Sequence, residues 1–459
     1  MYQIDFHHPS DVYFVGIGGI SMSGLAEILA RAGFRVSGSD SKASAVTAAL
    51  EQKGIRVFIG QREENIGSQI DCAIFTSAIR QDNPEYAAVR KRGIPSLTRA
   101  ELLGQIMKNY ATSIAVSGTH GKTTTTSMIG EILLHADADP TLTVGGMLRS
   151  IGGNLRIGKS DFFVTEACEY TNSFLHFFPK IGLILNIEED HLDFFQDLAQ
   201  IRRSFREFAR LIPEDGCLII NGDIPAFAEI TDGLPCRVVT YGSREGLDYH
   251  AENLRYVEHA QPVFALHGPG GSVRELTLRV PGEHNVSNAM AAAAAADFLA
   301  IPDEITARAL QGFTGTDRRF EYKGSIGGLT VIDDYAHHPT EITATLKAAG
   351  YYPHNTLWCV FQPHTYSRTH AFLKDFAQAL ALADKVVLAD IYAARETNTF
   401  AIHSQDLREA VETAGGECYY FPTFDEIENF LLGHCADGDL LITMGAGDVH
   451  IIGENLLGL

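Results

Sequence analysis

Short apolar runs alternate with longer Ala- and Leu-rich segments along almost the whole chain. Each apolar run is four or five residues long and rich in β-branched side chains, which is typical of a buried strand. Such runs begin at Val12, Cys72, Ser113, Gly182, Leu357, Lys385 and Leu440. Most are followed by a turn and by a segment with helical spacing. This alternation predicts an α/β fold built from parallel βαβ units.

New strand–loop–helix units open at Val12, at Ser113 and near Thr330. The length of 459 residues also suggests about three domains. We therefore place domain boundaries near residues 108 and 320. The segment from Arg237 to Arg279 breaks the alternation, because Gly and Pro separate its strand-like pieces. There we expect a small antiparallel sheet beside the parallel one.

The composition adds few constraints to this picture. Hydrophobic residues make up 45% of the chain and charged residues 20%, which excludes collagen-like, disordered and coiled-coil proteins. The net charge of −21 argues against nucleic acid as a partner, although a small basic pocket could still hold a phosphorylated ligand. No apolar run approaches the roughly 18 residues that cross a bilayer. Without a signal-peptide pattern or CxxC spacing, we expect a reduced, cytoplasmic protein.

The strongest local signal is the segment Ala115–Thr126, which follows an apolar strand and leads into a helical segment over 127–135. A strand, a glycine loop and a helix N-terminus together present backbone N–H groups to a polyphosphate. Val116 stands where the general GxxxxGK[ST] pattern has its first Gly, so the loop is tighter. The expected ATP contacts are Gly118, Thr119, His120, Gly121, Lys122, Thr123 and Thr124. The alternative is a plain Gly- and Thr-rich turn.

A second glycine loop, Gly16–Gly24, lies near the N-terminus, and Asp40 follows it after another strand. This arrangement resembles a dinucleotide fingerprint, but Ser21 stands in the position of the third Gly. The loop therefore indicates a binding site for a diphosphate near a helix N-terminus and is only weak evidence for NAD. The alternative is a turn that binds no ligand. Two such loops in separate domains suggest an enzyme that holds a nucleoside diphosphate derivative and hydrolyses ATP.

Acidic residues directly follow two of the predicted central strands in the sequence. Glu166 and Glu169 follow the strand that begins at Phe162, and the segment 186–193 contains four acids and His191. Carboxylate oxygens are the ligands that Mg²⁺ prefers, so we expect Glu166 and His191 to be functional. Glu188 and Glu189 are read instead as capping or solvated charges.

Further polar groups follow the later strands. The segment Val280–Ala289 opens an Ala-rich helix, and its Asn side chains suit the edge of an adenine, although they could simply cap the helix. His337 and His338 are adjacent and so rarely point at one ion; substrate contacts or capping are favoured over a metal. Arg368 is a candidate for gripping a carboxylate or phosphate.

In order and spacing, these motifs resemble those of the Mur ligases over nearly the whole chain. The resemblance implies a Rossmann-like domain for a UDP sugar (residues 1–108), a central P-loop ATPase (109–320) and a C-terminal Rossmann-like domain for an amino acid (321–459). It also implies an activity in peptidoglycan precursor synthesis. ATP would activate the lactoyl carboxylate of UDP-N-acetylmuramate as an acyl phosphate, and L-alanine would then form the amide.

The resemblance also assigns roles to residues. Lys122 would neutralise phosphoryl charge, Thr123 and Glu166 would hold one Mg²⁺, and His191 with Glu166 a second. Adenine would lie against Asn285 and Asn288. The UDP end would contact Gly16, Gly18, Gly19, Asp40, Thr76 and Ser77. The alanine site would be lined by Tyr335, His337 and Arg368, with His337 counted among the catalytic groups.

The sequence departs from related ligases at three positions. Thr365 stands where a second arginine often clamps the amino acid, Arg206 stands where some relatives carry a carbamoylated lysine, and Cys168 replaces an Asp. Three rival functions stay open: ligation of a recycled tripeptide to the same sugar, a nicotinamide dehydrogenase and a nucleotide switch. Either a monomer or a homodimer, without a membrane partner, is compatible with the sequence.

Overall fold

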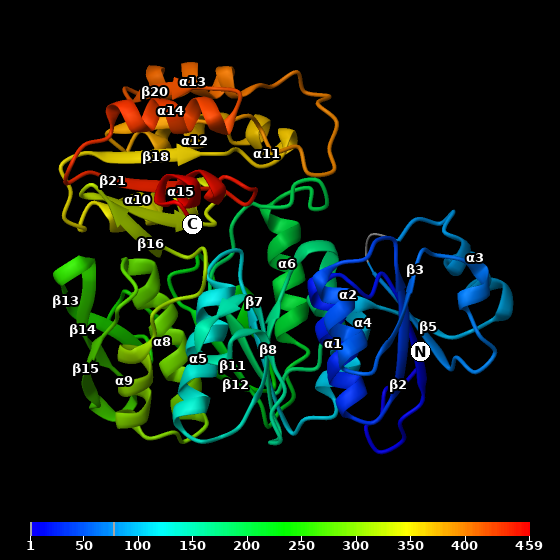
Figure 1. The fold of residues 1–459 in the computed structure, drawn as a ribbon. Helices are drawn as coiled ribbons and strands as arrows, with labels where there is room; N and C mark the ends of the chain where they lie inside the picture. The colour runs from blue at the N-terminus through cyan, green and yellow to red at the C-terminus, as the bar shows by residue number, and fades with distance from the viewer. Residues whose placement is uncertain (1, 77–78) are drawn as a thin grey trace.

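The chain folds into three α/β parts, each with its own sheet, in the computed structural model (Figure 1). The structure describes residues 2–76 and 79–459. The N-terminal part is drawn in blue beside the central part, and the C-terminal part lies above the central one in yellow to red. This arrangement confirms the α/β fold expected from the alternating pattern. Among the described residues, no helix is long and apolar enough to span a membrane.

The N-terminal sheet is parallel throughout, in the order β3-β2-β1-β4-β5. Because the strand order reverses beside β1, a crevice opens at the carboxyl ends of β1 and β4, where open α/β sheets bind ligands. The strands are β1 (Asp11–Val15), β2 (Arg35–Asp40), β3 (Arg56–Ile59), β4 (Cys72–Phe75) and β5 (Ser96–Thr98). The helices are α1 (Ile20–Arg31), α2 (Ala45–Gln52), α3 (Pro84–Arg92) and α4 (Arg99–Met107).

The central sheet has the order β15-β14-β13-β12-β11-β10-β6-β9-β7-β8. Its first strands are β6 (Thr112–Ser117), β7 (Thr141–Leu148), β8 (Gly153–Arg156), β9 (Phe162–Ala167) and β10 (Ile181–Ile184). The others are β11 (Cys217–Asn221), β12 (Arg237–Gly242), β13 (Tyr249–Val257), β14 (Gln261–His267) and β15 (Val273–Thr277). Its helices are α5 (Lys122–His135), α6 (Leu198–Ala209), α7 (Ala228–Thr231), α8 (Glu283–Phe298) and α9 (Asp303–Gly312).

The antiparallel strands are an extension of this sheet. β13, β14 and β15 pair antiparallel, as the sequence suggested, but β12 pairs parallel with β11 and joins β13 to the parallel strands. The expectation that the irregular segment starts at Arg237 was therefore wrong for β12. The reason is the connection, because α7 lies between β11 and β12 and returns the chain for parallel pairing.

The C-terminal sheet has the order β16-β17-β21-β18-β19-β20, and only the hairpin β16–β17 is antiparallel. Its strands are β16 (Glu321–Ile326), β17 (Leu329–Asp334), β18 (Leu357–Phe361), β19 (Lys385–Leu388), β20 (Glu417–Tyr420) and β21 (Leu440–Met444). Its helices are α10 (Pro339–Ala349), α11 (Tyr366–Ala371), α12 (Leu373–Leu380), α13 (Ser404–Thr413), α14 (Phe424–His434) and α15 (His450–Leu457).

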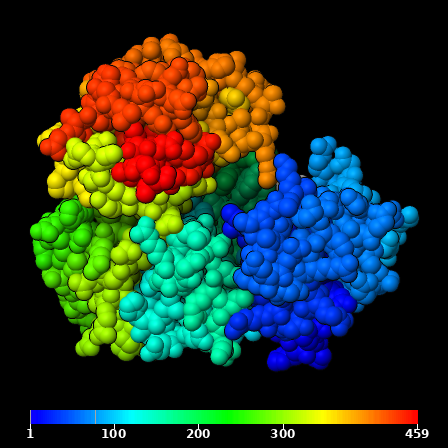
Figure 2. Space-filling view, in the orientation of Figure 1, coloured from blue at the N-terminus to red at the C-terminus, as the bar shows by residue number. Residues whose placement is uncertain are grey.

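Cavities lie where the three parts meet. One of about 340 Å³ lies between α1 and α4 of the N-terminal part, residues 143–145 of β7 and the end of β9. Another, of about 610 Å³, lies between the loop after β10 and residues 364–400 of the C-terminal part. The surface is hollowed between the blue N-terminal part and the orange segment of the C-terminal part (Figure 2). The sheets therefore direct their loops toward a shared central region.

Candidate active site

The central glycine loop joins β6 to α5, and its shape requires glycine at two positions. Gly118 has φ +144° and Gly121 has φ +81°. A Cβ at Gly121 would also lie 2.6 Å from Asn288 Oδ1. The amide of Asn186 fixes the loop from the next strand, accepting from His120 N at 2.7 Å and donating to His120 O at 3.1 Å. No side chain caps the start of α5, so its first N–H groups face the loop.

Lys122 is held inside this loop. Its Nζ donates to Gly118 O at 2.5 Å and to Thr119 O at 3.0 Å, and it pairs with Glu169 Oε2 at 3.1 Å. Burial disfavours the ammonium form, but the carboxylate of Glu169 outweighs burial and raises the pKa of Lys122 above its usual value. The loop therefore contains a fixed positive charge that suits a phosphate ligand.

Glu169 also connects Lys122 to the predicted metal ligand His191. His191 Nε2 lies 3.8 Å from Glu169 Oε1 and 3.7 Å from Asp190 Oδ2, and its ring lies 4.5 Å from that of Tyr170. From the sequence alone, Glu169 had no predicted role. Its position directly beyond the end of β9 was the signal that could have identified it.

The remaining predicted metal ligands, Glu166 and Thr123, lie on β9 and at the start of α5. Glu166 is on β9 and accepts a hydrogen bond from Gly145 N at 2.5 Å. Thr123 is buried in the first turn of α5, where a Cβ at Gly146 would meet its methyl group at 3.4 Å. Hydroxyl and carboxylate oxygens are the donors that Mg²⁺ prefers, so Thr123 and Glu166 suit that ion by donor type.

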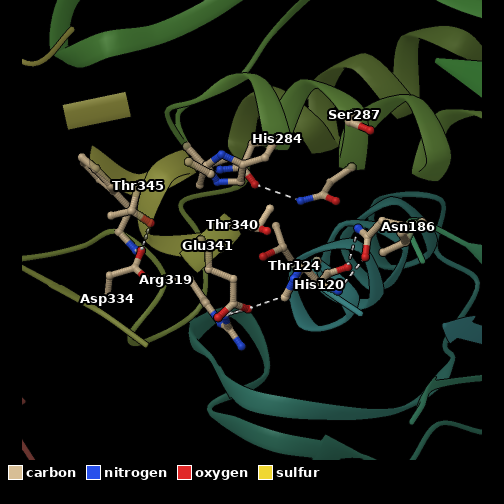
Figure 3. A pocket seen from close by; sticks show the side chains of 18 of the residues that line it. His120, Thr124, Asn186, His284, Ser287, Arg319, Asp334, Thr340, Glu341 and Thr345 are labelled. Carbon is tan, nitrogen blue, oxygen red and sulfur yellow. Dashed lines mark hydrogen bonds and ion pairs between the residues drawn. The ribbon is translucent and has the colours of Figure 1, made fainter. Parts of the chain in front are cut away.

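A cavity of about 230 Å³ lies between the glycine loop, the start of α8 and the start of α10 (Figure 3). The predicted adenine contacts Asn285 and Asn288 are buried in its wall. Asn285 Nδ2 donates to Pro281 O at 2.7 Å, and Asn288 Nδ2 donates to Asn285 Oδ1 at 3.1 Å. Each amide keeps further hydrogen-bonding capacity for a ligand.

The C-terminal part closes this cavity through Glu341, which had no predicted role. His120 Nδ1 lies 3.1 Å from Glu341 Oε1, and the two side chains point toward each other in Figure 3. Burial alone would lower the pKa of His120, but Glu341 and Glu188 raise it to about 9. Burial likewise opposes ionisation of Glu341, yet the protonated His120 beside it helps to hold its pKa well below the usual range. A charged pair therefore links the two parts at neutral pH.

The sequence of α10 explains the position of Glu341. Pro339 occupies the first helical position, and His338 caps the helix by accepting from Thr340 N at 3.4 Å. These residues place Glu341 in the first turn, where the helix dipole favours a carboxylate. Thr340 Oγ1 donates to Glu188 Oε2 at 2.6 Å, so Glu188 bridges the two parts. Our reading of Glu188 as a capping or solvated charge was therefore wrong, because its carboxylate accepts from Thr340 and lies 3.5 Å from His120 Nε2, although the side chain is 35% exposed.

Arg368 lies in the second interdomain cavity and already has a carboxylate partner. Its Nη2 donates to Asp190 Oδ1 at 2.8 Å, and its Nη1 lies 3.3 Å from His364 Nδ1. Burial would raise the pKa of Asp190, but Arg368 keeps it below its usual value. Thr365, in the position of the missing arginine, accepts from Arg368 N at 3.4 Å and caps α11.

The other predicted amino-acid contacts lie next to Arg368 and Glu341. His337 Nδ1 is 3.0 Å from Tyr335 O, and its ring packs against those of Tyr335 and His364 at 5.4 and 5.8 Å. Burial lowers the pKa of His337 to about 4, despite the opposing effect of Glu341, so its imidazole is neutral. His338 Nε2 lies 3.1 Å from Glu189 O, another contact between the parts.

The predicted UDP contacts lie apart from these groups, at the carboxyl ends of β1, β2 and β4. Gly16, Gly19, Asp40 and Thr76 line a cavity of about 580 Å³ there. Gly18 N donates to Asp40 Oδ2 at 2.9 Å, which ties the carboxylate to the glycine loop. Ser77 lies outside the described residues.

Sequence models of one family match all three parts. The Mur ligase family catalytic domain matches residues 11–111, the Mur ligase middle domain residues 116–296 and the Mur ligase glutamate ligase domain residues 318–447. The chain belongs to the Mur ligase family, as the motifs indicated.

Comparison with individual proteins shows which members of the family this chain is most similar to among those compared. A UDP-N-acetylmuramate–L-alanine ligase of Agathobacter rectalis is 57% identical over 100% of both chains, and one of Lachnospira eligens is 54% identical over the same share. Among solved structures, UDP-N-acetylmuramate-alanine ligase MurC from Thermotoga maritima has a TM-score of 0.80 and 30% identity over 98% of both chains. A murein peptide ligase from Psychrobacter arcticus has a TM-score of 0.69 and 25% identity, also over 98% of both chains.

Proposed function

We propose that this protein is an ATP-dependent ligase that joins L-alanine to the lactoyl carboxylate of UDP-N-acetylmuramate. The observation that carries this proposal is the 57% identity, over 100% of both chains, to a UDP-N-acetylmuramate–L-alanine ligase. The glycine loop with Lys122 and the cavities between the parts supply matching local chemistry. Peptidoglycan precursor synthesis is the corresponding role.

The three substrates are assigned to three domains. Residues 1–108 hold the UDP sugar, residues 109–320 hold ATP and residues 321–459 hold the amino acid. The boundary at 108 falls between α4 and β6, and the boundary at 320 falls immediately before β16, so neither interrupts a sheet. A cytoplasmic location and the choice between monomer and homodimer stay predictions.

Lys122 and the start of α5 prepare the phosphoryl transfer. Lys122 stays charged beside Glu169, and the uncapped N–H groups of α5 add positive potential where the β- and γ-phosphates would lie. When bound at Thr123, Glu166 and His191, Mg²⁺ would supply further charge neutralisation. Contacts from Glu341 and Thr340 connect the C-terminal part to the loop and to Glu188.

Two bond exchanges complete the reaction. The lactoyl carboxylate forms a bond to the γ-phosphorus while the bond to the β-phosphate oxygen breaks, which releases ADP and leaves an acyl phosphate. The amine of L-alanine then attacks the acyl carbon, the amide forms and phosphate leaves. Arg368 holds the carboxylate of the incoming amino acid, with Asp190 fixing the guanidinium. The neutral His337 lies beside it, where it can accept the proton that the amine loses.

A phosphate-release assay tests this proposal. Purified protein with ATP, Mg²⁺ and UDP-N-acetylmuramate is supplied with L-alanine, L-serine, glycine or a murein tripeptide, and release should be fastest with L-alanine. The similarity to a murein peptide ligase makes the tripeptide the informative competitor. Release with the tripeptide but not with L-alanine would refute the assignment, and release without any acceptor would indicate a nucleotide switch.

A further inference from the structure

A second group of metal-binding side chains lies on the antiparallel strands, outside the substrate cavities described above. His250 and Glu252 are on β13, and His267 is on β14 directly opposite His250. Because side chains alternate along a strand, residues 250 and 252 share one face, and a paired residue on the next strand joins them there. The other face, with Tyr249, Phe264 and Leu266, is buried in the core. The three polar groups therefore form a cluster on the outer face.

Two imidazole nitrogens converge on one carboxylate in this cluster. His250 Nε2 lies 3.2 Å from Glu252 Oε1, and His267 Nε2 lies 3.2 Å from Glu252 Oε2. The two rings stack with centroids 4.8 Å apart and planes 16° apart. One donor atom from each residue lies within 4.8 Å of the other two. The cluster thus presents three ligand atoms around one point.

These separations match the dimensions of a zinc site. Bonds of about 2.0–2.2 Å from tetrahedral zinc to nitrogen and oxygen put neighbouring ligand atoms about 3.4 Å apart. Two imidazoles and one carboxylate favour Zn²⁺ over Mg²⁺, which prefers oxygen ligands. The side chains of His250, His267 and Glu252 are 16%, 28% and 39% exposed, so a hydrated ion can reach them.

Among the described residues, one other group has similar spacing: His120, Glu188 and His338. There His120 Nδ1 pairs with Glu341 and His338 Nε2 contacts Glu189 O, while His120 Nε2 lies 3.5 Å from Glu188 Oε2 without a hydrogen bond in the described part of the chain. Glu188 in turn accepts from Thr340. That group holds two domains together, whereas the cluster on β13 and β14 has its donors directed at one another.

We propose that His250, Glu252 and His267 bind one Zn²⁺, with water in the fourth position, as a clamp across β13 and β14. His250 also pairs with Gly242 of β12, at the junction of the parallel and antiparallel strands. An ion there would stabilise the joint that attaches the antiparallel extension to the main sheet. The competing arrangement is metal-free, with both Nε2–H groups donating to Glu252.

One feature of His250 is common to both arrangements. Its Nδ1 is buried and has no hydrogen-bond partner in the part of the chain that the structure describes. With Zn²⁺ on Nε2 this atom would carry an unpaired proton, and with a proton on Nε2 it would keep an unpaired lone pair. Metal binding must therefore be measured directly.

The experiment titrates chelator-treated full-length protein with Zn²⁺ and follows heat of binding and thermal unfolding. We expect one equivalent to bind and the unfolding temperature to rise. His267→Gln and Glu252→Gln should each bind Zn²⁺ at least about tenfold more weakly and lose the thermal shift. Losing a residue that only supports a metal ligand already weakens metal affinity about tenfold or more, so losing the ligand itself should weaken it at least as much. His259→Gln changes an exposed histidine between the same strands and should behave like the unchanged protein.

A His120→Gln variant separates the two groups. It should keep both the binding and the thermal shift, because His120 belongs to the interdomain group. The proposal is overturned if the unchanged protein binds no Zn²⁺, if His267→Gln and Glu252→Gln bind as tightly as the unchanged protein, or if His120→Gln alone abolishes binding. Circular dichroism of each metal-free variant establishes that a loss of binding does not reflect unfolding.

Discussion

The N-terminal and central glycine loops have the same local architecture but different surroundings. Each joins a buried parallel strand to a helix N-terminus, at β1–α1 and at β6–α5. In the N-terminal loop the charged group is a carboxylate, Asp40, bound to Gly18 N. In the central loop it is Lys122, and Glu341 reaches over the loop from another domain. The two loops therefore share their glycine geometry and differ in the charges beside it, and we propose that this difference separates binding of a diphosphate from phosphoryl transfer.

The largest effect is expected from Lys122→Ala. Removing the ammonium should lower ligation at least about 100-fold, since preorganised charge at the transferred group has effects of that size. Binding of UDP-N-acetylmuramate should stay within about twofold, because its loop lies in another domain. Phosphate release and calorimetric titration measure the two quantities, and Lys159→Ala, at an exposed lysine, is the control. Loss of both together would contradict the separation of roles between the loops.

Asp40→Ala should produce the converse pattern. It removes the acceptor of Gly18 N and the acid expected to contact the sugar nucleotide. Hydrogen bonds to charged groups contribute about 1.5–3 kcal/mol, so the KM for UDP-N-acetylmuramate should rise at least about tenfold. The KM for ATP should stay the same in initial-rate measurements. Asp40→Asn retains one acceptor oxygen and should be milder, and an equal rise in both KM values would show that the two loops are not independent.

The pair of His120 and Glu341 predicts that the affinity for ATP, which the central loop is expected to bind, depends on pH. The raised pKa of His120 means that the stability of this contact is fully present below about pH 6.5 and is lost as pH rises through about 9. Affinity for ATP should therefore fall above pH 9.

Glu341→Gln removes the carboxylate that is the largest cause raising the pKa of His120. The KM for ATP should then be several-fold higher at pH 7, with a weaker change toward pH 9, in KM-against-pH profiles. The KM for the UDP sugar is the internal reference. Identical profiles for Glu341→Gln and the unchanged protein would show that the contact between His120 and Glu341 does not cause the pH dependence of the KM for ATP.

The sequence was informative about each loop and much less about what covers it. The positions of Lys122 beside the glycine loop and of Asn285 and Asn288 at a helix start could be predicted, because a strand, a glycine loop and a helix start are local patterns. Glu341 stands in a segment that was noticed, but its pairing with His120 depends on how two domains meet, and no local spacing encodes that. Glu188 was misread for the same reason. The strand β12 was misassigned because the Gly- and Pro-rich composition of its surroundings resembled that of a hairpin.

The smallest effect is expected from removing single exposed hydroxyls beside the two loops. Thr340→Val removes the hydrogen bond to Glu188 over the central loop, and Ser21→Ala removes the one from Arg99 Nη1, 3.1 Å away, beside the N-terminal loop. Each bond has one charged partner but is exposed to solvent, which screens its contribution to about 1 kcal/mol, or roughly a fivefold effect. Initial rates should show a higher KM for ATP in Thr340→Val alone and for the UDP sugar in Ser21→Ala alone. If Thr340→Val instead raised the KM for the UDP sugar, the C-terminal domain would govern closure over both substrates, and the contrast between the loops would fail.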